Sequence, residues 1–92
     1  MRTSQLIQNF LHGDTKGKAS NMHIEGDKLF NWETVIAQRI NGVIHINDTH
    51  YSPTTSKHQN HLRRELPEAP RVEGVMVGCH DLRRYVKEVA RG

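Results

Sequence analysis

Hydrophobic residues recur at helical spacing near the start of the chain and then give way to a polar stretch. The apolar positions of this first segment are Leu6, Ile7, Phe10 and Leu11. Thr3 or Ser4 can cap a helix that runs through His12. Residues 13–20 are polar and contain two glycines and two lysines, which is typical of a connection. We therefore predict a short helix and a flexible loop over residues 1–20.

Apolar and polar residues then alternate, which predicts β-strands. The extended segments are residues 21–25, 28–32, 35–40 and 43–47. Between the last two stands Asn41-Gly42, a pair that accepts a positive φ at both positions, as a type I′ hairpin turn requires. A two-residue turn predicts the register Ile40–Val43, Gln38–His45 and Ile36–Asn47.

This register divides the hairpin into two unlike faces. One face carries Ala37, Ile44 and Ile46, with Arg39 toward its edge, and can pack on a helix. The other carries Gln38, His45 and Asn47, and we expect that face to be more accessible to solvent.

A second helix is predicted after the hairpin. Thr54, Thr55 or Ser56 can cap it, and Pro67 ends it near Leu66. Its apolar anchors are Leu62 and Leu66. The opposite side carries Lys57, Asn60, His61 and Arg64 at positions i, i+3, i+4 and i+7.

The remaining residues, 67–92, begin with a proline-containing linker, followed by a short apolar segment over residues 72–77 that is predicted to be a strand or an extended packing arm. Asp81 can cap a last helix, whose apolar stripe is Leu82, Tyr85, Val86 and Val89. The far side of that helix carries Arg83, Arg84, Lys87 and Arg91.

These elements predict an α+β fold in a single domain, residues 1–92. We expect a small antiparallel sheet of three or four strands, with two or three helices packed on one face, and residues 21–66 as the sheet-and-helix core. The expected core residues are Leu6, Phe10, Ile24, Leu29, Ile44, Ile46, Leu62, Leu66, Leu82, Val86 and Val89.

Composition limits the classes of protein that the chain can represent. Only 35% of the 92 residues are apolar, and no run approaches the roughly 18 apolar residues of a membrane span. The single cysteine, Cys79, excludes an internal disulfide and fits a reducing compartment. We therefore expect a cytoplasmic protein, in a host cell, without a cofactor.

The positive charge is concentrated near the end of the sequence. The net charge is +3, yet residues 1–56 hold five basic and five acidic side chains, whereas residues 57–92 hold eight basic and five acidic ones. Such an asymmetry favours a polyanionic partner. The alternative is a pair of solvated helix faces.

The second predicted helix concentrates hydrogen-bond donors in its first turns. Donors suited to reading base edges or holding phosphates are Lys57, Gln59, Asn60, His61, Arg63 and Arg64. Together with Arg83, Arg84, Lys87 and Arg91, they lead to the hypothesis of a small non-enzymatic protein that binds DNA or RNA. A homodimer through the last helix or an open strand edge would add stability to so small a core.

Metal-dependent chemistry has weaker support, although the chain contains seven histidines. His58 and His61 could supply one pair of zinc ligands, but the chain has neither a Cys-x2-Cys nor a His-Glu-x-x-His motif, so we expect no metal site. A ββα-type nuclease would use His45 or His50 as base, with Asn60 and His61 holding the metal. The sequence lacks the Asp-His or His-His pair expected at the strand end, and chance in a histidine-rich chain is the preferred interpretation.

Three segments, Ser20–Phe30, Thr34–Ala37 and Tyr51–Asn60, resemble a group of small bacteriophage and mobile-element proteins. The similarity covers roughly residues 17–66, and the run Thr54-Thr55-Ser56-Lys57-His58-Gln59 is its most specific part. No activity is established for that group, so the resemblance implies only an accessory protein of phage origin. Proteins of that kind include inhibitors of host defence, similar to anti-CRISPR proteins. The alternative partner is therefore a host protein or ribonucleoprotein complex, contacted through Phe30, Trp32 and Tyr51.

Overall fold

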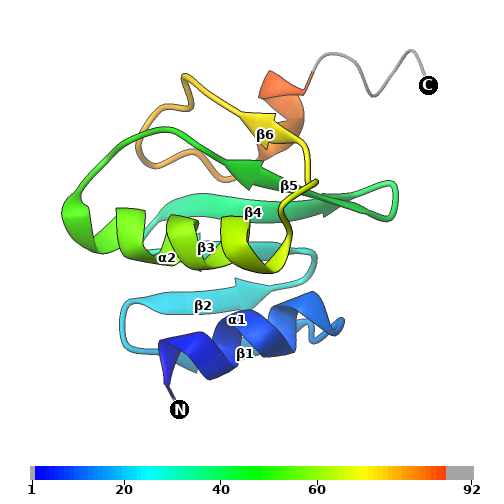
Figure 1. Cartoon of the computed structure of the whole chain (residues 1–92), viewed down its shortest axis with the longest axis vertical. Helices are drawn as coiled ribbons and strands as arrows, with labels where there is room; N and C mark the ends of the chain where they lie inside the picture. The colour runs from blue at the N-terminus through cyan, green and yellow to red at the C-terminus, as the bar shows by residue number, and fades with distance from the viewer. Residues whose placement is uncertain (1, 87–92) are drawn as a thin grey trace.

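The computed structural model describes residues 2–86 and contains one sheet with two α-helices on the same face (Figure 1). In chain order the elements are α1 (Thr3–Leu11), β1 (Lys16–Ala19), β2 (Met22–Glu25), β3 (Lys28–Asn31), β4 (Thr34–Ile40), β5 (Val43–Asn47), α2 (Pro53–Glu65), β6 (Arg71–Val72) and a 3-10 turn, η1 (Leu82–Tyr85). The α+β class is confirmed. Among the described residues, no helix is both long and apolar enough to cross a membrane.

The sheet is larger than predicted and is mixed. Its six strands follow the order β1-β2-β3-β4-β5-β6; the first five pair antiparallel, and β6 pairs parallel with β5. The expectation of three or four antiparallel strands is therefore wrong. The added strands are β1, in the segment predicted to be a flexible loop, and β6, which is shorter than the predicted strand.

Strand β1 forms from a polar sequence because only alternate residues face the core. Lys16 and Lys18 are exposed, as suits a strand at the sheet edge, while Ala19 is buried. Gly17 lies under α1, where a Cβ atom would stand only 2.9 Å from Leu6 Cδ1. The absence of a side chain at this position lets the helix approach the strand closely.

The predicted hairpin is confirmed at its turn and in the residue pairs next to it. Asn41 and Gly42 have φ of 53° and 80°, and the register pairs Ile40 with Val43 and Gln38 with His45. The described ladder ends at Ala37–Ile46, so the predicted Ile36–Asn47 pair is not part of it. The Asn47 side-chain amide instead donates to the carbonyl of Val35 at 2.9 Å.

Both α-helices cover one sheet face, as predicted, and bury most of the expected core. The core cluster on this face consists of Leu6, Ile7, Phe10, Ala19, Met22, Ile24, Leu29, Ile36, Ala37, Ile46 and Leu62. Ile44 and Leu66 pack against it partly buried. Each helix thus contributes an apolar stripe, and its polar side is left on the surface.

The opposite face, here called the back face, is covered by the C-terminal segment, residues 72–86. Its buried apolar residues are Phe30, Val35, Ile40, Val72, Val75 and Leu82, with Val86 half-buried beside them. Gln38, His45 and Asn47 are all buried, so the expectation of an accessible face is wrong. The segment satisfies Gln38 directly: Gln38 Nε2 donates to Asp81 Oδ1 at 3.0 Å, and the Leu82 N–H donates to Gln38 Oε1 at 2.7 Å.

The predicted last helix is represented by the short η1 turn. Asp81 does cap it, because its carboxylate accepts the Arg83 N–H at 3.0 Å, and Val86 is already extended. This turn packs on the back face rather than beside the two helices. Val89, Lys87 and Arg91 lie outside the described residues.

Candidate nucleic-acid interface

Helix α2 begins two to four residues earlier than a cap at Thr54, Thr55 or Ser56 predicts. Ser52 is its N-cap, accepting the Thr55 N–H at 3.2 Å, and Pro53 occupies the first helical position, where its missing N–H costs nothing. The first turn contains no acidic residue. The positive end of the helix dipole is therefore not complemented by a carboxylate of its own first turn.

One candidate binding residue of α2 is buried and cannot contact a ligand. Gln59 is only 2% exposed, and its Nε2 donates to the carbonyls of Asn47 and Thr49 at 2.7 and 2.8 Å. It holds α2 against the chain that leaves β5. Its inclusion among the donors for nucleic acid is therefore wrong, because helical spacing turns it toward the sheet.

Arg63 is also partly committed within the protein. Its guanidinium contacts the carboxylate of Asp48 and the side-chain oxygen of Asn60, and its side chain is only 26% exposed. Because Asp48 compensates its charge, Arg63 adds less to the surface potential than Lys57 or Arg64, which are exposed.

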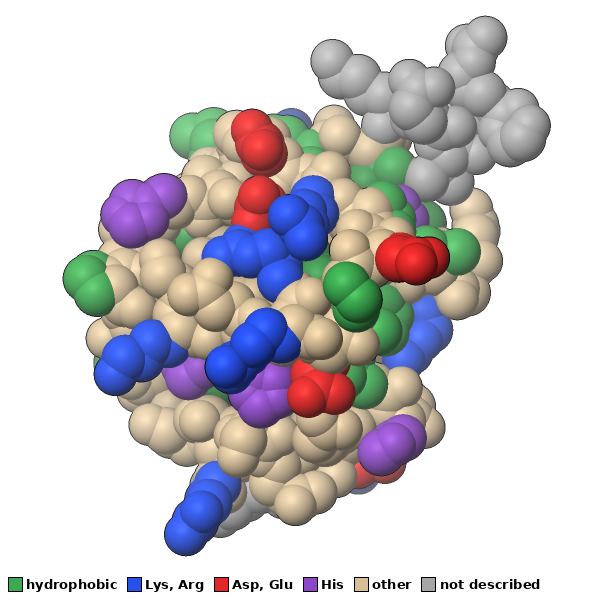
Figure 2. All heavy atoms as spheres, in the orientation of Figure 1, with side chains coloured by type: hydrophobic (Ala, Val, Ile, Leu, Met, Phe, Trp, Pro, Cys, Tyr) green, Lys and Arg blue, Asp and Glu red, His purple; other side chains and the backbone are tan. Residues whose placement is uncertain are grey.

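The remaining donors of α2 line a groove between α1 and α2. This hollow, of about 410 Å³, is bordered by Thr3, Ile7, Lys57, His58, Asn60, His61 and Arg64. None of these described lining residues is acidic. Figure 2 shows basic and histidine side chains gathered over α2 and its border with α1, with single acidic side chains between them.

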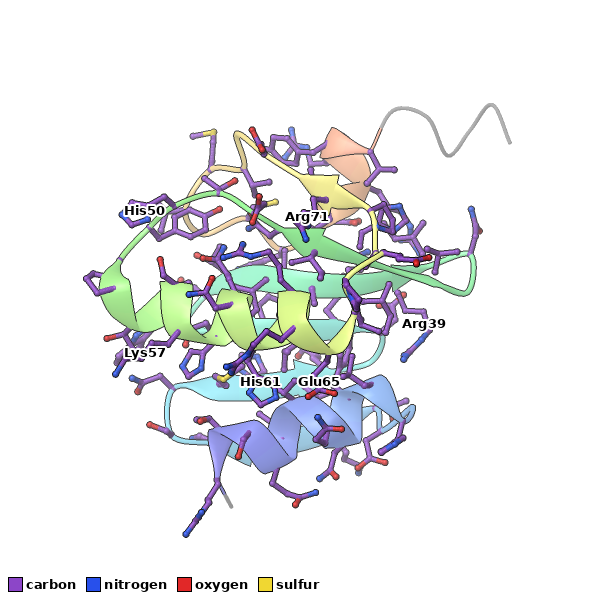
Figure 3. All side chains as sticks on the ribbon, in the orientation of Figure 1. Arg39, His50, Lys57, His61, Glu65 and Arg71 are labelled. Atoms are coloured by element: carbon purple, nitrogen blue, oxygen red, sulfur yellow. The ribbon has the colours of Figure 1, made fainter. Side chains whose placement is uncertain are left out.

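The two histidines that line the groove, His58 and His61, have different surroundings. Burial, with the positive charges of His61 and Lys57, lowers the pKa of His58. His61 Nε2 is buried without a hydrogen-bond partner among the described residues, and lies 3.8 Å from the carboxylate of Glu65 at the end of α2 (Figure 3). This nitrogen therefore belongs to a residue that lines the groove but is itself shielded from solvent.

The second predicted basic surface is separate from the first. Arg83 and Arg84 belong to η1 on the back face, whereas α2 covers the other face of the sheet. Arg83 also lies near two carboxylates, at 3.7 Å from Asp27 and 3.8 Å from Asp81. The predicted basic residues of α2 and those of η1 therefore form two surfaces rather than one.

His58, Asn60 and His61 line the same groove, but His45, the candidate nuclease base, does not join them. His45 is buried on the back face, on the other side of the sheet from His61, and its Nδ1 lies 3.2 Å from the Val43 carbonyl. His50 contacts Ser56 at 3.3 Å. Within the described part of the chain, no group of three or more His, Cys, Asp or Glu side chains is arranged to hold a metal ion.

The three aromatic residues considered for protein contact have different environments. Phe30 is buried, stacked on His23 with ring centroids 4.7 Å apart, so it cannot serve as an anchor. Trp32 is 65% exposed in the β3–β4 turn. The Tyr51 hydroxyl donates to the Val75 carbonyl at 2.6 Å and accepts from Asn47, while its ring lines a pocket that Trp32 also lines.

Comparisons of the chain with protein-family models, curated proteins and solved structures give no match.

Sequence reasoning did not identify one pocket of the structure. A pocket of about 320 Å³ lies between the β3–β4 turn and the start of α2, and Asn31 and Thr55 line it together with Trp32 and Tyr51. The sequence contained one signal, which is an aromatic residue in a tight two-residue turn. The partnership of Asn31 with a helix 24 residues away has no local signature.

Proposed function

We propose that this protein is a non-enzymatic nucleic-acid-binding accessory protein that uses the α1–α2 groove. The observation that supports this function best is the lining of that groove, where Lys57 and Arg64 flank Asn60 and His61 without an acidic neighbour among the lining residues. Lysine and arginine bind phosphates, and the asparagine amide can pair with a base edge.

The proposal predicts weak, salt-dependent binding. Two phosphate contacts release about two counterions, so affinity should fall about tenfold between 50 and 200 mM salt. A dissociation constant of about 10⁻⁴–10⁻⁶ M at physiological salt is typical of such contacts. Anisotropy titrations with labelled single-stranded and duplex oligonucleotides at both salt concentrations measure these quantities.

Matched double variants test whether the groove is the binding surface. Lys57→Ala with Arg64→Ala removes two positive charges from the groove and should weaken binding about tenfold at 50 mM salt. Lys18→Ala with Arg84→Ala removes the same number of positive charges, one from β1 and one from the back face. This control should leave affinity within about twofold of the parent. Equal losses in the two double variants, or no binding at 50 mM salt, would contradict the proposal.

A further inference from the structure

We propose that the pocket beside Trp32 binds an unpaired nucleobase, so that the nucleic acid bound by this protein is single-stranded. This inference rests on the proposed function and makes it specific. The pocket lies between the β3–β4 turn, the start of α2 and the loop that carries Val77, and its volume of about 320 Å³ is at the lower end for ligand sites.

Trp32 combines an unfavourable backbone conformation with an exposed aromatic ring. Its φ is +58°, a left-handed conformation that bulky side chains rarely adopt and that glycine or asparagine would adopt more easily. A strained position that holds a 65% exposed aromatic ring is typical of a binding site. Bases of single strands stack on such rings, whereas bases inside a duplex are already stacked.

Asn31 supplies an unsatisfied polar group at the same place. It is 3% exposed, and its Nδ2 donates to Thr55 Oγ1 at 2.8 Å, but its Oδ1 has no hydrogen-bond partner among the described residues. Reversing the amide would let Thr55 donate to the oxygen and would leave the nitrogen unpaired instead. Either way, one end of a buried amide in the pocket lining has no hydrogen-bond partner among the described residues.

The surroundings of the pocket favour a ligand that also carries phosphate. Ser52, the N-cap of α2, and Thr55 line it, so the positive end of this 13-residue helix is adjacent. Lys57 and His50 extend from the same end of the molecule (Figure 3). An apolar protein side chain would fill the pocket without using the amide or the positive helix end, which is why we commit to a base on a phosphate backbone.

The fluorescence of Trp32 provides a direct test, because it is the only tryptophan in the chain. Adding a twelve-nucleotide single strand should quench this fluorescence, and a hairpin duplex of the same composition should not. Trp32→Asn suits the left-handed turn and should lower single-strand affinity about tenfold, which lies within the range measured for stacking of one base. Val43→Asn, at the exposed first residue of β5 and so at the opposite end of β4 from the β3–β4 turn, is the matched control and should bind like the parent.

A second variant examines the amide. Asn31→Ala removes the unpaired group and should reduce differences in affinity among homopolymers of dT, dA and dC. Unfolding curves for each variant identify any that fail to fold.

The outcomes separate this inference from the proposed function. Equal binding of single strand and duplex, unaffected by Trp32→Asn but weakened by Lys57→Ala with Arg64→Ala, would overturn the base pocket and leave the proposed function standing. If neither single strand nor duplex binds at 50 mM salt, both the base pocket and the proposed function are overturned. The Trp32 pocket would then have to bind a ligand of another class.

Discussion

The two hydrogen bonds of the Gln59 side chain predict that this residue stabilises the fold and takes no part in ligand binding. Replacing it with alanine removes both bonds to the carbonyls of Asn47 and Thr49. Each neutral bond contributes about 1 kcal/mol, and the shortened side chain leaves part of a buried site unfilled. We therefore expect Gln59→Ala to lower the free energy of unfolding by about 2–3 kcal/mol.

Urea unfolding followed by circular dichroism measures this loss. At a denaturant slope of about 1.5–2 kcal/mol/M, the midpoint should fall by about 1–2 M. Asn60→Ala, one residue along the helix at an exposed position, is the control and should change stability by less than about 0.5 kcal/mol. Where both variants are folded, Gln59→Ala should keep the oligonucleotide affinity of the parent, and Asn60→Ala should lose some. A stable Gln59→Ala variant with lost affinity would refute the structural role assigned to Gln59.

Two further predictions concern the back face and pH. Gln38→Ala should loosen the C-terminal segment, seen as faster limited proteolysis over residues 73–86. Gln38→Ala should also raise the pKa of Asp81. In the parent protein, burial raises this pKa, but the hydrogen bonds from Gln38 and from the Arg83 N–H, together with nearby positive charges, outweigh burial and lower it. Removing the Gln38 hydrogen bond takes away one of the lowering influences. His58 has a lowered pKa in the folded state, mainly through burial, so the unfolded chain binds its proton more readily. The free energy of unfolding is therefore not reduced by His58 above about pH 6.5, and it falls as the pH drops below that value and the unfolded chain takes up the proton. Urea midpoints at pH 7.5 and 5.5 should differ accordingly, and by less in His58→Asn; an unchanged difference would contradict this assignment.

Local features of the fold could be predicted because their causes are local. The Asn41-Gly42 turn determines its own conformation and thereby the pairs Ile40–Val43 and Gln38–His45. The apolar spacing of α1 and α2 also depends only on neighbouring residues. Helix α1 lies within two residues of its predicted bounds; α2 ends within one residue of its predicted end but begins two to four residues earlier than predicted.

The rest of the fold depends on partners that are distant in the sequence. The segment around Gly17 reads as a loop, and it becomes a strand because β2 pairs with it and Leu6 packs over it. Gln38 reads as a solvent-facing residue, and it is buried because Asp81 and Leu82, more than 40 residues later, bind both ends of its amide. A polar residue in an alternating strand therefore does not by itself identify an exposed face.

The same argument applies to the candidate site. Sequence spacing grouped six donors of α2, yet packing turned Gln59 inward and Asp48 engaged Arg63, which leaves Lys57, Asn60, His61 and Arg64 around the groove. The excess charge of the C-terminal part is likewise divided by the sheet, with α2 on one face and η1 on the other. A ligand held in the groove can therefore use only a fraction of the net charge of +3. Under the proposed function, specific contacts such as those of the proposed Trp32 pocket would have to provide the affinity that charge alone does not.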